Sequence, residues 1–157
     1  MENEKADAVQ AAAQLAKQFH KGQIDKAGKD YFEGHLSSVA NYGENWKEQI
    51  VGYLHAAEDT PHTVSETIHL LQDKCPNIAT KDWEEIETAL NLMNSHTAAN
   101  REAYINRFRN NTLAIRVKLN DLRHNMDISR IPNPTEKDIA RAARYRREYS
   151  QLKKMLE

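Results

Sequence analysis

The chain contains 157 residues, the size of a single domain, and is long enough to bury a hydrophobic core without disulfides or a structural metal. Its 22 Lys and Arg residues balance 23 Asp and Glu residues, and the formal net charge of −1 argues against a dedicated nucleic-acid-binding protein, which usually shows a basic excess. The single cysteine, Cys75, excludes an intrachain disulfide and a cysteine-built zinc site. No apolar run approaches the roughly 20 residues of a membrane span, and the N-terminus lacks signal-peptide features, so we expect a cytoplasmic protein with no membrane contact.

The first half of the chain shows four helix-period patterns of apolar residues and no convincing strand alternation. The first helix is expected over about residues 4 to 20, followed by a loop over 21 to 30 that contains two glycines. A second helix is expected over 31 to 42, and a third, largely buried one contains Trp46, Ile50 and Leu54. After the break at Thr60-Pro61, Thr63 is expected to cap a fourth helix, with Glu66 three residues later. The inward residues of that fourth helix are predicted to be Val64, Ile68, Leu70 and Leu71.

Three further helical segments complete the chain. Thr80 is expected to begin and cap a fifth helix that buries Trp83, Ile86, Leu90 and Met93. The longest helical pattern covers about residues 101 to 130. The last helix, over about 135 to 157, follows Pro134 and is opened by Thr135 with Asp138, a variant of the capping box. The patterns predict a compact all-α bundle that forms one domain over residues 1–157.

Three polar clusters lie on or beside apolar helix faces, where an unpaired histidine or carboxylate is costly. The second cluster places His55, Glu58 and Asp59 at positions i, i+3 and i+4, so that all three would project from one side of a helix. This spacing suits a metal ligand beside a carboxylate that orients or deprotonates a water molecule. His35 and Asp121, on other helices, would complete a mixed nitrogen–oxygen site of the kind that suits Mn²⁺, Zn²⁺ or Fe²⁺.

A structural interpretation of the same residues stays open, because a buried histidine hydrogen-bonded to a nearby aspartate is common in helical cores. His124 is interpreted as an orienting group next to Asp121. His62, His69 and His96 have no such neighbours in the sequence and are expected at the surface or at helix ends.

The order and context of the three clusters carry a family resemblance. The first cluster contains His20-Lys21-Gly22-Gln23, then Gly28 to Tyr31, then His35 to Ala40; the second runs from Leu54 to Thr60, and the third from Val117 to Met126. These stretches resemble the HD-superfamily hydrolase domain of the alarmone (guanosine tetra- and pentaphosphate, ppGpp and pppGpp) enzymes, which include RelA/SpoT-type proteins and small stand-alone hydrolases. The resemblance extends over about residues 11 to 130 and implies an HD-domain helical bundle, with a C-terminal helix over about 135 to 157.

The resemblance implies a role for each matching residue. His35, His55 and Asp121 match ligands of a Mn²⁺ ion. Glu58 and Asp59 match the pair that serves the water molecule attacking the 3′-pyrophosphate. Lys26 and Asn125 match residues that help to hold the nucleotide, and the products would be a guanosine 5′-polyphosphate and pyrophosphate.

The chain departs from the family pattern in its second cluster. The family has His-Asp, two intervening residues and then Glu-Asp, whereas His55-Ala56-Ala57-Glu58-Asp59 is one residue shorter and has no aspartate after the histidine. A one-residue deletion rotates a helix by about 100°. Either His55 keeps its place and the aspartate is missing, or Glu58 and Asp59 keep theirs and the histidine is missing; in both cases Glu58 is a candidate replacement ligand. Asp25 also stands where the family usually has an arginine that packs on the base.

Our sequence-based hypothesis is a metal-dependent phosphohydrolase that hydrolyses a nucleotide pyrophosphate, such as that of ppGpp, with a metal-bound water. Lys21, Lys26 and Arg123 are candidates to neutralise the pyrophosphate. The alternative hypothesis is a degenerate, non-catalytic HD-domain protein that binds a nucleotide or a protein partner, which the shortened second cluster favours.

Overall fold

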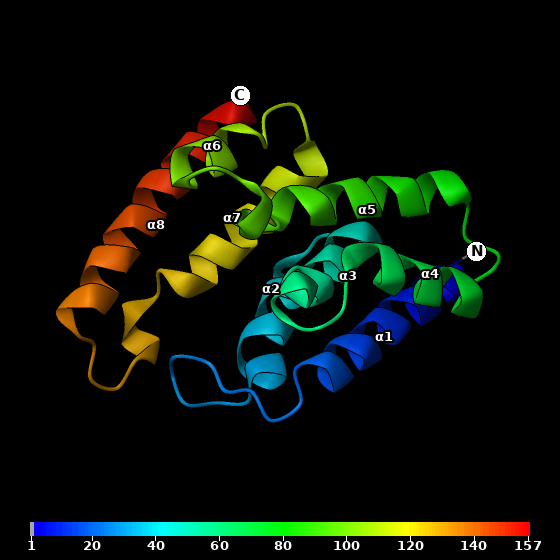
Figure 1. The fold of residues 1–157 in the computed structure, drawn as a ribbon, viewed down its shortest axis with the longest axis horizontal. Coiled ribbons are helices and arrows are strands. Elements are labelled where there is room, and N and C mark those ends of the chain that lie inside the picture. Colours follow the sequence, from blue (N-terminus) through cyan, green and yellow to red (C-terminus); the bar gives the residue numbers. More distant parts are fainter. Residues whose placement is uncertain (1) are drawn as a thin grey trace.

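The structure, a computed structural model, describes residues 2–157 and consists of helices joined by turns (Figure 1). Within these residues there is no β-strand, only an isolated antiparallel bridge between Ile24 and Asp30. The predicted all-α fold is therefore confirmed. The α-helices are α1 (Glu2–Phe19), α2 (Ser37–Tyr42), α3 (Trp46–Leu54), α4 (Val64–Lys74), α5 (Thr80–Met93), α6 (Arg101–Asn106), α7 (Thr112–Asn125) and α8 (Glu136–Met155). Short helical turns are η1 (Phe32–Leu36), η2 (Ala57–Asp59), η3 (Ser95–Thr97) and η4 (Ile128–Arg130).

Side-chain caps define where several helices begin. The capping boxes predicted for α4 and α8 are confirmed, with reciprocal hydrogen bonds between Thr63 and Glu66 and between Thr135 and Asp138. The cap predicted for α5 is wrong, because Thr80 is already the first helical residue. The alanine before it occupies the cap position, and its side chain has no acceptor.

The segment from residue 101 to 130 is not one helix, as expected from its apolar pattern, but α6, α7 and the turn η4. The break follows from two asparagines. Asn110 adopts a left-handed backbone conformation with φ of 71°, which asparagine tolerates better than most residues. Asn111 then accepts a hydrogen bond from the backbone N–H of Ala114 and so starts α7 as a new helix.

Helix α3 lies at the centre of the bundle, where it packs against α1, α2, α5 and α7 (Figure 1). Helix α8 runs along the outside of α7, on the far side of the molecule from α1 (Figure 1). Leu70, expected to face inward from α4, is instead 37% exposed, because it lies off the stripe that the other three predicted residues form. The largest fully buried side chains include Trp83, Tyr104, Phe108, Leu36, Ile50, Leu54, Ile86 and Leu122.

A close approach of α2 and α3 depends on Gly52. A Cβ atom at this position would lie 2.9 Å from the Cα of Ala40, closer than such atoms come in proteins. Because only glycine lacks a Cβ, the two helices can pack backbone to backbone here. The contact brings the C-terminal end of α3 beside the turn η1 and α2 that follows it.

Candidate metal centre

Three side chains from distant parts of the sequence meet at one buried point. His35 lies on the π-helical turn η1, His55 follows the last residue of α3, and Asp121 lies on α7. The Nε2 atoms of the two histidines lie 2.9 Å (His35) and 3.3 Å (His55) from the same oxygen, Oδ1 of Asp121. One ligand atom from each residue falls within 4.8 Å of the other two, so the three could hold a metal ion together.

The hydrogen bonds of His55 favour a cation between these atoms. Its Nδ1 lies 2.7 Å from the carbonyl oxygen of Gly52, which can only accept, so Nδ1 carries the proton. A ring that carries its only proton on Nδ1 presents the Nε2 lone pair to this carboxylate oxygen, so that two acceptors face each other. A bound metal ion would satisfy both, and the carbonyl partner of Nδ1 is the usual support of a histidine ligand.

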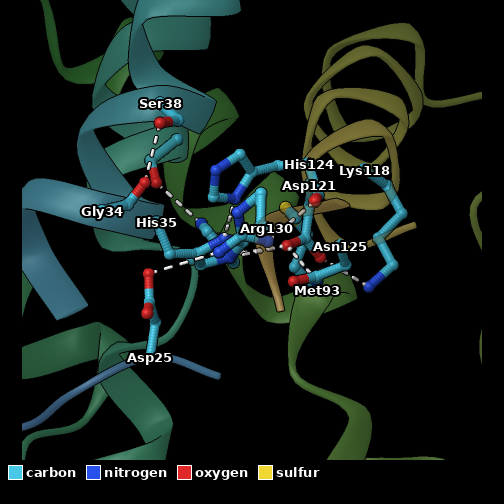
Figure 2. A network of polar contacts seen from close by, with 12 residues as sticks. Asp25, Gly34, His35, Ser38, Met93, Lys118, Asp121, His124, Asn125 and Arg130 are labelled. Atoms are coloured by element: carbon cyan, nitrogen blue, oxygen red, sulfur yellow. Dashed lines mark hydrogen bonds and ion pairs between the residues drawn. The ribbon is translucent and has the colours of Figure 1, made fainter. Parts of the chain in front are cut away.

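His35 has a comparable support in His124, as Figure 2 shows. The two Nδ1 atoms are 2.8 Å apart, so one of them donates to the other. Burial, followed by the neighbouring His35 and Arg130, lowers the pKa of His124 to about 4. Its ring is therefore neutral at pH 7 and can accept the Nδ1 proton of His35, which would leave Nε2 of His35 free to bind a metal. Burial also lowers the pKa of His35, so this ring is neutral as well.

Asp121 is held in its ionised form. Burial alone would raise its pKa, but the charges of Lys118 and then of His55 hold that pKa well below the usual range of an aspartate. Lys118 is itself buried, and its Nζ lies 2.9 Å from Oδ2 of Asp121, whose charge raises the pKa of the lysine above its ordinary value. Oδ1 also accepts a hydrogen bond of 3.0 Å from Asn125. The carboxylate thus presents Oδ1 to the histidines while Oδ2 is engaged by the lysine.

A pocket of about 280 Å³ opens onto these three residues. Its walls carry basic side chains from four segments: Lys26 from the loop after α1, Arg101 from α6, Lys118 from α7 and Arg130 from η4. Tyr31, Tyr104 and Tyr145 also line it. A site with nitrogen and oxygen ligands at its floor and cations on its walls is suited to an anionic ligand.

Asp25 and Arg130 join the first loop to the end of α7, as Figure 2 shows. The guanidinium of Arg130 lies 3.2 Å from Oδ2 of Asp25 and donates to the carbonyl oxygen of His124 at 2.9 Å. The other carboxylate oxygen of Asp25 accepts hydrogen bonds from the backbone N–H groups of Ala27 and Lys29. Asp25 therefore organises the loop that presents Lys26 to the pocket.

The two predicted catalytic carboxylates do not share a helix face with His55, and this expectation is wrong. Helix α3 ends at Leu54, and Glu58 and Asp59 lie on the separate turn η2. Glu58 accepts a hydrogen bond of 2.7 Å from the backbone N–H of Val64 at the start of α4, outside the pocket lining. It therefore does not replace the missing ligand. Asp59 does line the pocket, and its Oδ1 lies 2.7 Å from Nε2 of His96.

The register of the shortened cluster follows from these positions. His55 lies beside Asp121, and the next residue, Ala56, is buried and lines the pocket. Of the two arrangements considered from the sequence, the geometry matches the one in which His55 meets Asp121. His96 lies at the surface, as expected, and its Nε2 pairs with Oδ1 of Asp59.

The residues predicted to bind substrate divide into two groups. Lys26 and Asn125 line the pocket. Lys21 and Arg123 are exposed and do not, and the guanidinium of Arg123 stacks on the ring of Tyr42, 4.0 Å from its centroid. Three basic residues that line the pocket had no predicted role: Arg101, Lys118 and Arg130. Of these, Lys118 carried a signal, because it lies three residues before Asp121 on the same helix.

Comparisons with known proteins leave the family open. No protein-family model matches the chain, and no curated protein matches it significantly. Among residues 2–157, no helix has the length and apolar character needed to cross a membrane.

Proposed function

We propose that this protein is a divalent-metal-dependent phosphohydrolase of the HD type, which hydrolyses the pyrophosphate group of a nucleotide such as ppGpp. The observation that carries the proposal is the convergence of His35, His55 and Asp121 at the floor of a pocket with basic walls. The resemblance of the three sequence clusters to alarmone hydrolases supports the choice of reaction.

The donor set fits a divalent cation with mixed nitrogen and oxygen ligands, and Mn²⁺ is the expected ion. His35, His55 and Asp121 would hold it, with His124, Gly52 and Lys118 fixing their orientations. Bound there, the ion would supply Lewis-acid activation of water and of a phosphoryl oxygen. The basic side chains on the walls would bind and orient the phosphates of the substrate.

Asp59 is the carboxylate placed to handle a proton, since it lines the same pocket and Glu58 does not. In the proposed reaction Asp59 accepts the proton of the attacking water, and the Nε2 of His96 holds Oδ1 of Asp59 in place. This assigns to Asp59 alone the task that the resemblance gave to the Glu-Asp pair.

The test is the release of pyrophosphate from ppGpp by purified protein in the presence of Mn²⁺. We expect turnover by the natural sequence, loss of at least about a hundredfold in Asp59→Asn, and loss of both turnover and Mn²⁺ in Asp121→Asn. Arg147→Gln, which changes an exposed arginine away from the pocket, is the matched control. Folded, Mn²⁺-loaded protein that releases no pyrophosphate from ppGpp or related nucleotides would refute the proposal.

A second candidate function is binding of a nucleotide or protein partner without turnover. The observation that favours it is the hydrogen bond of Glu58 with the backbone of Val64. The site then has three candidate metal ligands, His35, His55 and Asp121, and one further carboxylate, that of Asp59. This candidate predicts substoichiometric Mn²⁺ in purified protein and a nucleotide affinity that Asp121→Asn does not change. Stoichiometric metal together with turnover would exclude it.

A further inference from the structure

One part of the pocket wall contains Arg101, a residue without a recognisable signal in the sequence. Its Nε and Nη2 donate to the two carboxylate oxygens of Glu148 on α8, at 2.8 and 2.9 Å. The carboxylate partner is buried, with a relative exposure of 4%, whereas the Arg101 side chain is 32% exposed and lines the pocket. A paired, buried carboxylate therefore holds a guanidinium at the pocket surface in one orientation.

This guanidinium retains donors for a ligand. A guanidinium has five N–H groups in a fixed planar fork, and the contacts with Glu148 use one on Nε and one on Nη2. Among the described residues, no hydrogen bond from Nη1 of Arg101 is found. Arg101 thus combines a fixed position with an unused edge, which is the arrangement that binds phosphate oxygens in proteins.

A series of contacts connects Arg101 with Asp121 through Tyr104 and Lys118. Its guanidinium lies over the ring of Tyr104, 4.9 Å from the centroid, and Nζ of Lys118 lies 5.1 Å from the same centroid. Lys118 in turn contacts Asp121. A ligand bound at His35, His55 and Asp121 could therefore extend along this wall, from the lysine toward the arginine.

We propose that Arg101 anchors a subsite for a second phosphoryl group, next to the one at the metal-binding residues, with Glu148 as its positioning residue. The inference deepens the proposed function and rests on it for the identity of the first phosphoryl position. The substrate class it names is a compound with two linked phosphoryl groups, of which inorganic pyrophosphate is the smallest member. A single phosphate would reach one position and not the other.

The test compares the binding of inorganic pyrophosphate and inorganic phosphate to Mn²⁺-loaded protein by calorimetry. The natural sequence is expected to bind pyrophosphate at least about tenfold more tightly than phosphate, because one charge-assisted contact is worth about a factor of ten. In the double variant Arg101→Met/Glu148→Met this preference should fall to about twofold or less. The double variant avoids a buried unpaired carboxylate, and such paired apolar replacements usually fold.

Two single variants separate binding from structural support. Glu148→Gln keeps the arginine but removes the charge that orients it, and is expected to weaken pyrophosphate binding while leaving phosphate binding unchanged. Arg147→Gln removes a positive charge from the same helix without touching the pocket and is expected to change neither affinity. If Arg147→Gln lost as much pyrophosphate affinity as Glu148→Gln, pyrophosphate would be responding only to the overall positive charge of the protein. That result would overturn the subsite.

The subsite and the proposed function fail in different ways. If a folded double variant keeps the full pyrophosphate preference, the subsite is wrong, even when the protein hydrolyses ppGpp. If the natural sequence shows the preference and the double variant loses it, the subsite stands, even when no nucleotide is hydrolysed and the proposed function is wrong. Absence of any preference for pyrophosphate in the natural sequence also refutes the subsite.

Discussion

Asp121 contacts His35, His55, Lys118 and Asn125, and so it links the two histidines to the buried lysine. Its two oxygens have different surroundings, since Oδ2 contacts the lysine while Oδ1 faces the rings. Among its neighbours, Lys118 contributes most to balancing this negative charge. Removal of that lysine would therefore leave a buried carboxylate that a metal ion can compensate.

This dependence gives a prediction for Lys118→Met. The metal-free variant should lose about 3 kcal/mol of unfolding free energy, because a buried charge is left without its partner. Mn²⁺ should restore more stability to the variant than it adds to the natural sequence, since the ion takes over the role of the lysine. Chemical denaturation with and without Mn²⁺ measures both quantities. Equal metal-induced stabilisation of the two proteins would show that Lys118 and the ion do not act on the same carboxylate.

Glu58 and Asp59 are neighbours in sequence but have separate tasks, and a pair of alanine variants tests this. Glu58→Ala removes the acceptor of the Val64 N–H at the start of α4 and should lower the unfolding free energy by about 1 kcal/mol, with Mn²⁺ affinity unchanged. Asp59→Ala should leave stability within about 0.5 kcal/mol, since both Asp59 and His96 are largely exposed. Denaturation curves and Mn²⁺ titrations decide the matter. Loss of Mn²⁺ binding in Glu58→Ala would mean that Glu58 is a ligand after all.

At this scale the sequence predicted the clustering of two histidines and an aspartate better than the positions of Glu58 and Asp59. His35, His55 and Asp121 could be picked out because their types and order are informative without any knowledge of where helices end. The roles of Glu58 and Asp59 required α3 to continue past His55. It ends at Leu54, and the carboxylate of Glu58 caps the next helix, a tertiary contact that no spacing rule contains.

At the scale of elements, the position of the site depends on how closely α3 approaches α2. His35 is carried by the π-helical turn η1, which continues directly into α2, and His55 by the end of α3. Gly52 is where the two helices touch, and its carbonyl oxygen also accepts the Nδ1 proton of His55. Position 52 therefore affects both the spacing of the two helices, through its missing Cβ, and the orientation of His55, through its carbonyl oxygen.

Gly52→Ala should separate the ligands without emptying the core. The added Cβ would lie 2.9 Å from the Cα of Ala40, so that α3 must shift away, at a cost of about 1 to 3 kcal/mol. Because His55 moves with α3 while His35 does not, Mn²⁺ affinity should fall at least about tenfold. Gln49→Ala, on the same helix, is the control and should keep full affinity. An unchanged Mn²⁺ affinity in Gly52→Ala would show that the spacing of α2 and α3 does not position the ligands.

Helix boundaries could be predicted where a capping side chain marks the first turn. They could not be predicted where a break depends on the backbone conformation of a single residue. Thr63 and Thr135 begin α4 and α8 as the capping-box pattern indicates. The separation of α6 from α7 depends on the left-handed conformation of Asn110, which an apolar periodicity does not reveal. Arg101 and Asp121 therefore line the same pocket from two separate helices.

On the scale of the whole molecule, the pocket is assembled from segments at both ends of the chain. The loop after α1 supplies Lys26, α7 supplies Asp121, and α8 supplies Tyr145 together with the carboxylate that orients Arg101. The sequence indicated an all-α bundle and a last helix over about residues 135 to 157. It did not indicate that α8 packs along α7 and closes one wall of the site, because many packings of an amphipathic helix bury the same face.

Binding of an ion to residues from three separate segments should stabilise the fold as a whole. Mn²⁺ at about one hundred times its dissociation constant adds about 2.7 kcal/mol if it binds only the folded state, which corresponds to a rise in melting temperature of about 5 to 11 °C for a domain of this size. The rise should be reversed by EDTA and absent in Asp121→Asn, which lacks the charge on which the two histidines converge. Differential scanning calorimetry of the two proteins, with and without Mn²⁺, measures it. An equal rise in Asp121→Asn would place the ion elsewhere on the molecule, and the three segments would then meet for structural reasons alone.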